Sequence, residues 1–441
     1  MNIRIIYKND LLPDDIINGY VSQLIKEFRS RKINSGDLVL CRAGSQLGTI
    51  IQWLACLDTG IIPIFIPFDY EFSSFQSFIN RVDIKLEVDT KDNIQHVLSE
   101  VIVNENKTTL KNISSGSVIH VTSATTGSPK VVLRTKSQLD AEIERYIYHL
   151  KFTENDVFLP IIPFYHSFGF ISAMLVCMKV GATLVIPDIV LPRNIIESCN
   201  LHKVSVLMSV PYFYSKMCDV SKKYQFINKV KFAIASGAPM EIGLQDNFIE
   251  RFGFPLLQQY GSTETGSLSI SEPNDEYNNV GRPFNGVYFN IINDMNNKPW
   301  ISVSTLQTLG SYISDDGVVK PQAEFIKLGD IGSISESGKL IIYGRGDDVL
   351  TISGKKFSKQ AIIKVIEKFD GIETADISIM ENNNFKELVC EYTGKKKIPY
   401  ESIINHCKKY LPDYQIPKQY SMSDKIDSSG KKRSWKNKML K

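Results

Sequence analysis

The sequence predicts an α/β protein. We expect a large N-terminal domain of layered, mostly parallel sheets with helices, a small β-barrel-like part, and a small α/β domain at the C-terminus. Apolar runs alternate with helical segments up to Ser271, and short strand-like runs with turns but no long helix follow. A glycine-containing segment, residues 344–348, then precedes a unit with one clear helix. The 441 residues suffice for two domains, which we place at residues 1–346 and 347–441.

Each element is expected for a local reason. Apolar side chains at helical spacing predict a helix over residues 11–31, and short apolar runs bounded by glycine, proline or polar residues predict buried strands. The expected strands cover residues 38–41, 61–66, 117–121, 131–134, 157–162, 183–186, 204–208, 230–235, 287–292 and 340–343. The expected helices cover residues 11–31, 47–57, 138–150, 170–180, 194–202, 212–220, 242–252 and 359–369. This alternation is typical of parallel sheets.

Charge, cysteine content and hydropathy argue against a nucleic-acid-binding, zinc-binding, disulfide-bonded or membrane-spanning protein. The net charge of +3 is small, so we expect no nucleic-acid partner, although the basic tail after Lys425 leaves nucleic-acid binding as an alternative. Seven scattered cysteines without a C-x-x-C pair predict neither a zinc site nor a disulfide framework and indicate a reducing compartment, so we expect a cytoplasmic protein. Residues 157–178 lack charged side chains, but Pro160, Pro163 and His166 argue against a membrane-spanning helix.

A polar loop between two expected strands is the first candidate site. Residues 121–130 read Val-Thr-Ser-Ala-Thr-Thr-Gly-Ser-Pro-Lys, a run of hydroxyls with one glycine, closed by a proline and Lys130. Backbone N–H groups and hydroxyls in such a loop can surround a phosphate, with the lysine as a point charge. The spacing is not that of a Walker A loop. A hairpin turn with a solvated lysine is the alternative.

Further polar motifs follow other expected strands. They are Pro-Phe-Tyr-His-Ser-Phe-Gly at residues 163–169, Ser-Gly-Ala-Pro at 236–239 and Tyr-Gly-Ser-Thr-Glu-Thr at 260–265. Active sites of α/β folds lie beyond the carboxyl ends of the strands. We therefore expect these motifs to gather at one edge of a sheet.

In this order the motifs resemble those of the adenylate-forming enzymes: acyl-CoA synthetases, adenylation domains of non-ribosomal peptide synthetases and firefly luciferases. Residues 122–130 resemble the phosphate loop, 163–169 the substrate-side histidine motif, and 236–239 and 260–264 the adenine and Mg²⁺ motifs. Residues 280–283, 329–330 and 344–347 continue the family's order, and 429–431 resemble the catalytic-lysine motif. The resemblance extends from about Gly36 to Arg433.

The resemblance implies a two-step reaction. A carboxylic acid is joined to the α-phosphate of ATP with release of pyrophosphate, and the acyl group then passes to the thiol of coenzyme A or of a carrier protein's phosphopantetheine. Two anions must meet in the first step, so positioning and charge neutralisation dominate. The implied catalytic residues are His166, Glu264 and Lys431, of which Glu264 also binds Mg²⁺ and Lys431 bridges carboxylate and phosphate oxygens.

The resemblance also implies which residues bind ATP. The residues expected to bind the β- and γ-phosphates are Thr122, Ser123, Thr125, Thr126, Gly127 and Lys130. Those expected to bind the adenine are Ser236, Gly237, Ala238, Tyr260 and Gly261. Thr263 is placed beside the α-phosphate, and Asp330 and Arg345 at the ribose. Taken singly, Glu264 could equally begin a helix, Asp330 could sit in a turn, Tyr260 and His166 could belong to the core, and Arg345 could lie in a solvated loop.

The domain boundary has an implied mechanical role. In the family that this chain resembles, the small C-terminal domain is mobile and rotates about a hinge, which corresponds to Asp347. One orientation delivers Lys431 for adenylation, and the other admits the thiol.

Several positions depart from the family's pattern. Ala124 and Val131 replace common glycines, residues 300–310 lack the usual Gly-Glu-Leu motif, and Arg433 arrives one position early, so that Lys432 is an alternative to Lys431. These departures motivate the competing hypothesis of a degenerate, non-catalytic adenylate-binding or interaction protein.

The expected substrate class is inferred from the absence of an aspartate near the substrate-side histidine motif. Residues 165–169 contain no aspartate to pair with a substrate ammonium, so an aryl or fatty acid is favoured over an α-amino acid. The residues expected to line the acyl pocket are His166, Phe168, Ser209, Val210, Ser236, Gly237 and Gly261.

Overall fold

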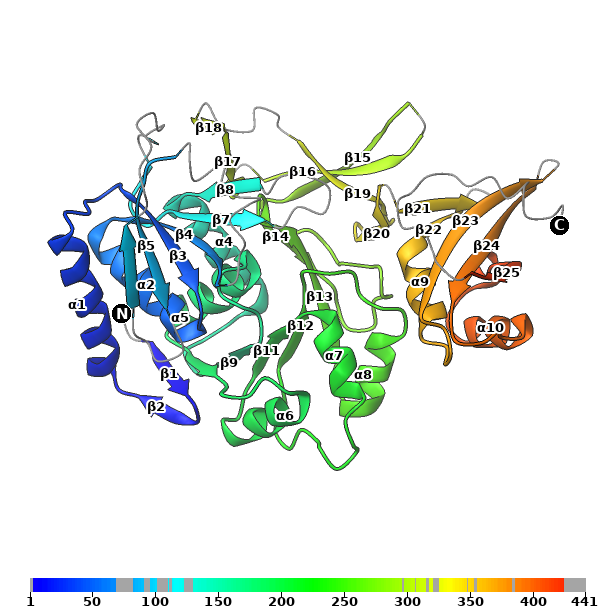
Figure 1. Cartoon of the computed structure of the whole chain (residues 1–441), viewed down its shortest axis with the longest axis horizontal. Coiled ribbons are helices and arrows are strands. Elements are labelled where there is room, and N and C mark those ends of the chain that lie inside the picture. Colours follow the sequence, from blue (N-terminus) through cyan, green and yellow to red (C-terminus); the bar gives the residue numbers. More distant parts are fainter. Residues whose placement is uncertain are drawn as a thin grey trace.

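The computed structural model describes residues 3–68, 82–90, 96–100, 110, 113–122, 130–295, 297–305, 307–314, 317–319, 325–346, 348–352, 355–382 and 385–423. Layered sheets with helices make up the large N-terminal part, and a smaller α/β unit follows it (Figure 1). The predicted fold class is confirmed.

One eight-stranded sheet carries most of the polar motifs. Its order is β14-β13-β12-β11-β9-β10-β1-β2, and neighbours pair in parallel from β13 to β1. The strands are β1 (Arg4–Tyr7), β2 (Asp10–Leu12), β9 (Val157–Pro160), β10 (Thr183–Ile186), β11 (Val206–Ser209), β12 (Phe232–Ala235), β13 (Leu256–Ser262) and β14 (Gly266–Ile270). Helices α6 (Pro192–Leu201), α7 (Pro211–Cys218) and α8 (Leu244–Phe252) connect them. The carboxyl ends of β11, β12 and β13 therefore meet at one edge.

A second eight-stranded sheet has the order β18-β17-β8-β7-β4-β3-β5-β6. Its strands are β3 (Leu38–Ala43), β4 (Ile62–Pro67), β5 (Ile84–Thr90), β6 (His96–Glu100), β7 (Val118–Thr122), β8 (Lys130–Arg134), β17 (Ser311–Ser314) and β18 (Gly317–Val319). The antiparallel β7–β8 hairpin flanks the predicted phosphate loop. In the chain, helix α1 (Asp14–Ser30) precedes β3, α2 (Gln46–Thr59) connects β3 to β4, and α4 (Lys136–Leu150) follows β8.

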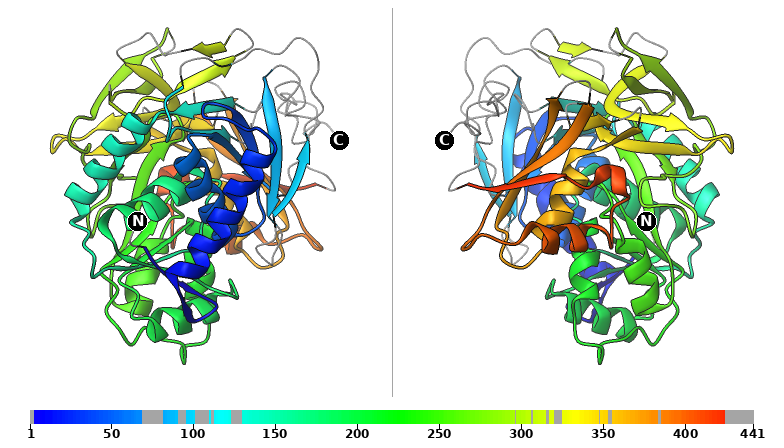
Figure 2. Two further views of the ribbon diagram at one scale, coloured as in Figure 1. Left: turned by 90° about the vertical axis from the view of Figure 1, so that its left-hand side faces the viewer. Right: turned by 90° about the vertical axis from the view of Figure 1, so that its right-hand side faces the viewer.

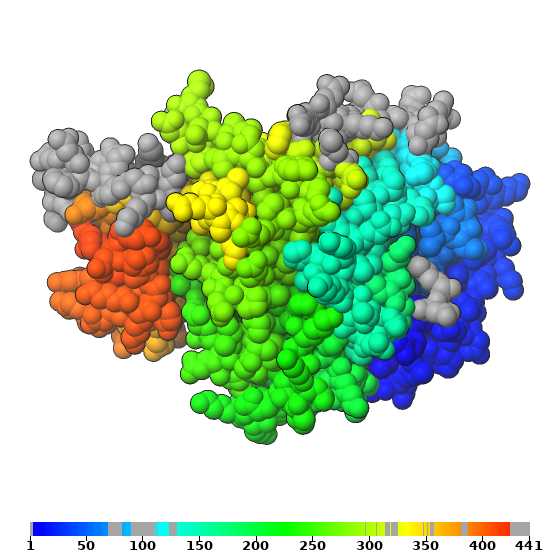
Figure 3. All heavy atoms as spheres, turned by 180° about the vertical axis from the view of Figure 1, so that it is seen from behind, coloured from blue at the N-terminus to red at the C-terminus, as the bar shows by residue number. Residues whose placement is uncertain are grey.

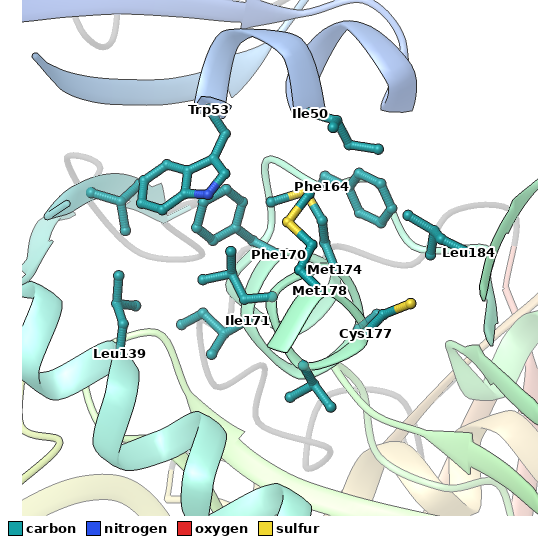
Figure 4. Packing of buried hydrophobic residues seen from close by; sticks show 14 of the residues in the cluster. Ile50, Trp53, Leu139, Phe164, Phe170, Ile171, Met174, Cys177, Met178 and Leu184 are labelled. Atoms are coloured by element: carbon teal, nitrogen blue, oxygen red, sulfur yellow. The ribbon is translucent and has the colours of Figure 1, made fainter. Parts of the chain in front are cut away.

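The main core joins the two sheets through helices. Trp53 of α2 packs edge-on against Phe170 at a ring-centroid distance of 5.0 Å, and Ile171, Met174 and Leu139 of α4 lie around them (Figure 4). Phe170 belongs to a π-helical stretch, η2 (Phe168–Leu175), which continues as α5 (Val176–Val180). Because this helix is apolar on all sides, it is buried between the layers.

Local sequence signals set the helix ends. Ser45 Oγ accepts the N–H of Gly48 at the start of α2, which ends at Gly60 in the left-handed conformation. At the start of α4, Thr135 and Gln138 form a reciprocal capping box. These caps satisfy helix-end N–H groups that would otherwise lack partners.

The region expected to be barrel-like is a four-stranded antiparallel sheet. It consists of β15 (Tyr288–Asn293), β16 (Pro299–Ser304), β19 (Ile326–Ile334) and β20 (Leu340–Arg345). The pairing of β19 with β20 places Asp330 directly opposite Arg345. Two positions that are 15 residues apart in the sequence are thus brought together.

The C-terminal unit has its own core and adjoins the N-terminal part (Figure 3). It contains β21 (Val349–Ile352), β22 (Lys355–Ser358), α9 (Lys359–Glu367), β23 (Thr374–Asn382), β24 (Phe385–Thr393), α10 (Tyr400–Cys407), a short 3₁₀ turn η3 (Asp413–Gln415) and β25 (Gln419–Met422). The right-hand view of Figure 2 looks onto this unit. Its core begins at Ile352, and the predicted hinge residue Asp347 lies outside the described residues.

Three local differences from the expected elements have physical reasons. The first helix begins at Asp14 rather than at residue 11, because β2 pairs with β1 at the edge of the sheet. The helix expected over residues 170–180 begins as η2, where Gly169 lies so close to the carbonyls of Ile162 and Pro163 that a Cβ would collide with them. Helix α10, stabilised by the C-terminal core, was not predicted.

Among the described residues, every helix is either too short or too polar to cross a lipid bilayer.

Candidate functional site

A cleft of about 1010 Å³ lies between the N-terminal part and the C-terminal unit. Its N-terminal walls include the carboxyl ends of β12 and β13, the middle of β19 and the end of β20 that pairs with it. Predicted site residues that line this cleft are Ser236, Gly237, Ala238, Tyr260, Gly261, Asp330 and Arg345. The C-terminal unit contributes residues such as Phe357, Ser358, Gln360 and Lys364. Four motifs that are widely separated in the sequence therefore converge on one cavity.

Asp330 is the centre of a hydrogen-bonded cluster in this cleft. Its Oδ2 accepts the Tyr260 hydroxyl at 2.6 Å, and its Oδ1 accepts Nη1 of Arg345 at 3.2 Å. Burial raises the pKa of the Asp330 carboxyl above its ordinary value, while the hydrogen bonds from Tyr260 and Arg345 act in the opposite direction. Neighbouring Gly329 has a φ of +83°, and a Cβ there would lie against the guanidinium of Arg345. The cluster thus presents an oriented carboxylate to the cleft.

Lys130 and Glu264 meet at the mouth of the predicted phosphate loop. Lys130 Nζ lies 3.8 Å from Glu264 Oε1, and the Tyr312 hydroxyl donates to the same oxygen at 3.2 Å. Thr122 Oγ1 donates to the Lys130 carbonyl at 3.3 Å, which closes the β7–β8 hairpin. The predicted phosphate ligands Ser123, Thr125, Thr126 and Gly127, with Ala124, lie outside the described residues. Since the Lys130 side chain is 63% exposed, its ion pair contributes little to stability and leaves the ammonium accessible.

Glu264 is carried by a turn between β13 and β14, residues 262–267, which we call the Glu264 turn. Within it, Ser262 Oγ lies 3.0 Å from Thr265 Oγ1, and Gly310 N–H donates to the Glu264 carbonyl at 2.7 Å. Arg134 Nη1 donates to the Thr263 carbonyl at 3.1 Å. The segment that lacks the Gly-Glu-Leu motif therefore still holds the Glu264 backbone through Gly310.

The histidine motif reaches the same turn. Ser167 Oγ lies 3.3 Å from Thr263 Oγ1, and the His166 ring packs against the Tyr165 ring at a centroid distance of 4.4 Å. Burial lowers the pKa of His166, so the neutral imidazole is favoured at pH 7. Phe168 follows as the first residue of η2.

The residues expected in the acyl pocket lie partly together. Ser236 N–H donates to the Ser209 carbonyl at 3.2 Å, and Ser236 Oγ donates to the Gln259 carbonyl at 3.0 Å. A Cβ built on Gly237 would have Val210 as its neighbour at 3.8 Å. These contacts tie the ends of β11, β12 and β13 into one wall.

The residue before the predicted hinge is held by the N-terminal part, and an ion pair joins the C-terminal unit to that part. Lys298 Nζ donates to the Gly346 carbonyl at 3.1 Å, and Gly346 lies so close to the Trp300 ring that a Cβ would overlap it. Lys368 of the C-terminal unit pairs with Glu241 at 2.8 Å. The predicted catalytic residue Lys431 and its alternative Lys432 lie outside the described residues.

Several residues of the site were not predicted. Arg134 was included only as the end of an expected strand, although a charged residue in so apolar a run was an available signal. Ser167 stands in the histidine motif but was given no role there. Tyr312 and Gly310 carry no local signal, because their contacts with the Glu264 turn depend on the tertiary structure.

The carboxylate of Glu264 suits a metal ion such as Mg²⁺ that takes most of its ligands from a bound nucleotide and water. Glu264 supplies a carboxylate that is 17% exposed, and the described residues contain no group of three or more His, Cys, Asp or Glu side chains placed to hold a metal. Mg²⁺ commonly binds through one or two carboxylates together with phosphate oxygens and water. The residues present therefore fit a nucleotide-bound Mg²⁺ better than a protein-enclosed metal.

Comparisons with known proteins show which family the chain resembles in sequence. The profile of the AMP-binding enzyme family matches residues 18–302, well over half of the chain. A methyl-dioxo-octahydroindenyl propanoyl:CoA ligase of Mycobacterium tuberculosis is 25% identical over 320 residues, covering 69% of this chain, which spans 62% of that relative's length. A 3,4-dihydroxybenzoate–aryl-carrier-protein ligase of Bacillus anthracis is 25% identical over 304 residues, covering 68% of each chain.

Among solved structures, the O-succinylbenzoate coenzyme A synthetase of Bacillus subtilis in complex with AMP superimposes with a TM-score of 0.77. The sequence identity is 18%, and the superposition covers 97% of this chain and 92% of that one. At this identity the likeness concerns the fold, and the profile match establishes the family. The chain belongs to the AMP-binding enzyme family.

Proposed function

We propose that this chain is an ATP-dependent ligase that joins a carboxylic acid to a thiol through an acyl-adenylate. Two observations support this proposal. Tyr260, Asp330 and Arg345 meet in the cleft, and Lys130 pairs with Glu264, which follows Tyr260 by four residues in the same motif. A cation, a hard carboxylate and an oriented ribose-type acceptor are the groups needed to bind a nucleoside triphosphate.

In the proposed first step, a carboxylate oxygen of the acid bonds to the α-phosphorus of ATP while the bond to the β-phosphate breaks and pyrophosphate leaves. Lys130 holds the phosphates that become the leaving group, and Thr263 lies beside the α-phosphate. Asp330 accepts the ribose hydroxyls, with Arg345 and Tyr260 orienting it. When bound at Glu264, Mg²⁺ would neutralise charge on the phosphate oxygens. In the second step, a thiolate sulfur bonds to the acyl carbon and AMP leaves.

The substrate and acceptor classes are part of this proposal. A carboxylic acid with an aryl or fatty tail is favoured because residues 165–169 offer no carboxylate to a substrate ammonium. The acceptor is the phosphopantetheine thiol of coenzyme A or of a carrier protein, and the names of the two relatives represent both kinds of acceptor. All seven cysteines are free thiols, which supports a reducing, cytoplasmic location.

Acid-dependent exchange of labelled pyrophosphate into ATP tests the first step. With Mg²⁺ and a panel of aryl, fatty and amino acids, we expect exchange with an aryl or fatty acid and none with α-amino acids. Exchange with an amino acid would overturn the substrate class. If folded, ATP-binding protein exchanged with no acid in a broad panel, the alternative of a degenerate adenylate-binding protein would replace the ligase.

The role of Lys431 can be separated from that of the rest of the site by assaying the two half-reactions. We expect Lys431→Ala to lower adenylate formation by about 10²-fold or more, because a positive charge is lost where two anions meet. Thioester formation from supplied acyl-AMP should change little. Lys432→Ala is the matched control in the adjacent position. If Lys432→Ala alone blocks adenylation, the assignment moves to Lys432.

A further inference from the structure

A buried ion pair lies beneath the Glu264 turn. Arg134, the last residue of β8, donates from Nη2 to Oε2 of Glu142 in α4 at 2.7 Å, and the two side chains are 0% and 3% exposed. The other oxygen of Glu142 accepts the N–H and the hydroxyl of Ser267 at 2.8 and 3.0 Å. Arg134 Nη1 donates to the carbonyl of Thr263. The pair therefore forms hydrogen bonds with the backbone of the turn on both sides of Glu264.

Two glycines make room for this arrangement. Gly266 has a φ of +71°, and a Cβ there would fall within the carboxylate of Glu142. At Gly310 a Cβ would press on Cδ of Arg134, and the N–H of the same residue donates to the Glu264 carbonyl. The backbone of the turn is thus held by hydrogen bonds on several sides and has little freedom to shift.

Stability alone does not explain the pair. Taking two charges out of water is costly, and apolar residues of similar volume often serve a core equally well. Among the described residues, Nε of Arg134 also finds no acceptor. The ion pair forms directional hydrogen bonds to the backbone of the turn, and apolar residues in its place would form none.

We propose that Arg134 and Glu142 are positioning residues, which hold the Glu264 turn so that the Glu264 carboxylate and Thr263 face the phosphates and Mg²⁺ of ATP. This inference rests on the proposed function, since it requires that ATP–Mg²⁺ binds at Glu264. Both side chains are buried and act through the backbone of residues 263 and 267.

The test is the double variant Arg134→Met/Glu142→Leu, which removes both charges at similar volume and leaves neither charge buried alone. The matched control is Arg42→Met/Glu87→Leu, which removes the ion pair between β3 and β5 of the same sheet. For each protein, ATP affinity is measured by calorimetry with Mg²⁺ and with EDTA, together with the thermal midpoint. We expect the gain in affinity due to Mg²⁺ to fall about tenfold in the Arg134/Glu142 variant, as it does when a group that holds a metal-binding side chain in place is removed.

The control should keep the wild-type gain, even if its thermal midpoint falls by a similar amount. If the Arg134/Glu142 variant folds and keeps the wild-type Mg²⁺ dependence of ATP binding, the inference is wrong. If that variant fails to fold, Arg134→Lys is measured in its place. This substitution keeps the positive charge beside Glu142, but the shorter side chain no longer reaches the carbonyl of Thr263. It should show the same loss of Mg²⁺ dependence, and a wild-type dependence in Arg134→Lys would also overturn the inference.

The same measurements distinguish this inference from the proposed function. Wild-type protein that binds ATP with a Mg²⁺-dependent gain but catalyses no exchange would remove the ligase proposal and still decide the role of the pair. Wild-type protein that does not bind ATP would remove both.

Discussion

Replacing Glu264 by glutamine should lower the rate of ATP–pyrophosphate exchange by about 10²- to 10³-fold, the usual effect of removing one charge-stabilising group from an active site. The substitution preserves shape and leaves an amide oxygen that can still accept the Tyr312 hydroxyl. It removes the negative charge that faces Lys130 and that would bind Mg²⁺. The concentration of Mg²⁺ needed for half-maximal exchange should rise as well.

Glu272→Gln is the control for this prediction. Glu272 is 56% exposed and pairs with Lys339, away from the Lys130–Glu264 contact. Its exchange rate and Mg²⁺ dependence should equal those of the wild type. If Glu264→Gln retained the wild-type rate at low Mg²⁺, the metal would have to bind elsewhere, and the assignment of Glu264 would be lost.

The second large effect is expected at Asp330. Asp330→Asn should raise the KM for ATP by about 10- to 100-fold, because charge-assisted hydrogen bonds contribute about 1.5–3 kcal/mol each. The turnover number should change less, since the ribose lies away from the reacting phosphate. The charge of the Asp330 carboxylate also orients Arg345, so the variant disturbs two groups of the cleft.

The pH dependence provides an independent measure of the same group. Burial raises the pKa of Asp330, so its charge is lost at a higher pH than that of an exposed aspartate as the solution is acidified. The wild-type KM for ATP should therefore increase on the acid side, and Asp330→Asn should lack this increase.

Asp156→Asn is the buried control. Asp156 lies just before β9, accepts Ser205 Oγ at 2.9 Å and pairs with Lys231, at the opposite end of the sheet from the cleft. Its substitution should lower thermal stability and leave the KM for ATP unchanged. An equal change of KM in both variants would mean that the effect of Asp330→Asn comes from general destabilisation.

Much of the fold was predictable because the central strands of the two largest sheets are mostly parallel and buried. Strands that are covered on both faces read as short continuous apolar runs, as in β3, β4 and β11, and the helices between them are amphipathic or capped. Strand β1 and the edge strand β2 were not predicted because they are short and partly exposed. Helix α10 lacks a side-chain N-cap hydrogen bond, and it buries Ile403 and Cys407 in the core of the C-terminal unit.

The candidate site was predictable to the extent that its residues stand in contiguous motifs. Tyr260 was expected at the adenine, and Asp330 and Arg345 at the ribose of the same nucleotide. In the structure the three lie within one hydrogen-bonded cluster. The contacts made by Tyr312 and Ser167 were not predictable, since a side chain that reaches across from another strand or loop has no fixed spacing in the sequence.

By itself, the sequence determined most of the alternating strands and helices up to Ser271, the resemblance to the family, and the polar residues available at strand ends, because periodicity and motif spacing are local properties. Only the tertiary structure decided which of these residues meet. It paired β19 with β20 so that Arg345 faces Asp330, and it brought Glu264 beside Lys130. It also buried Arg134 against Glu142 beneath the Glu264 turn. These contacts join residues distant in the chain, so they follow from the packing of whole sheets and helices rather than from any one segment.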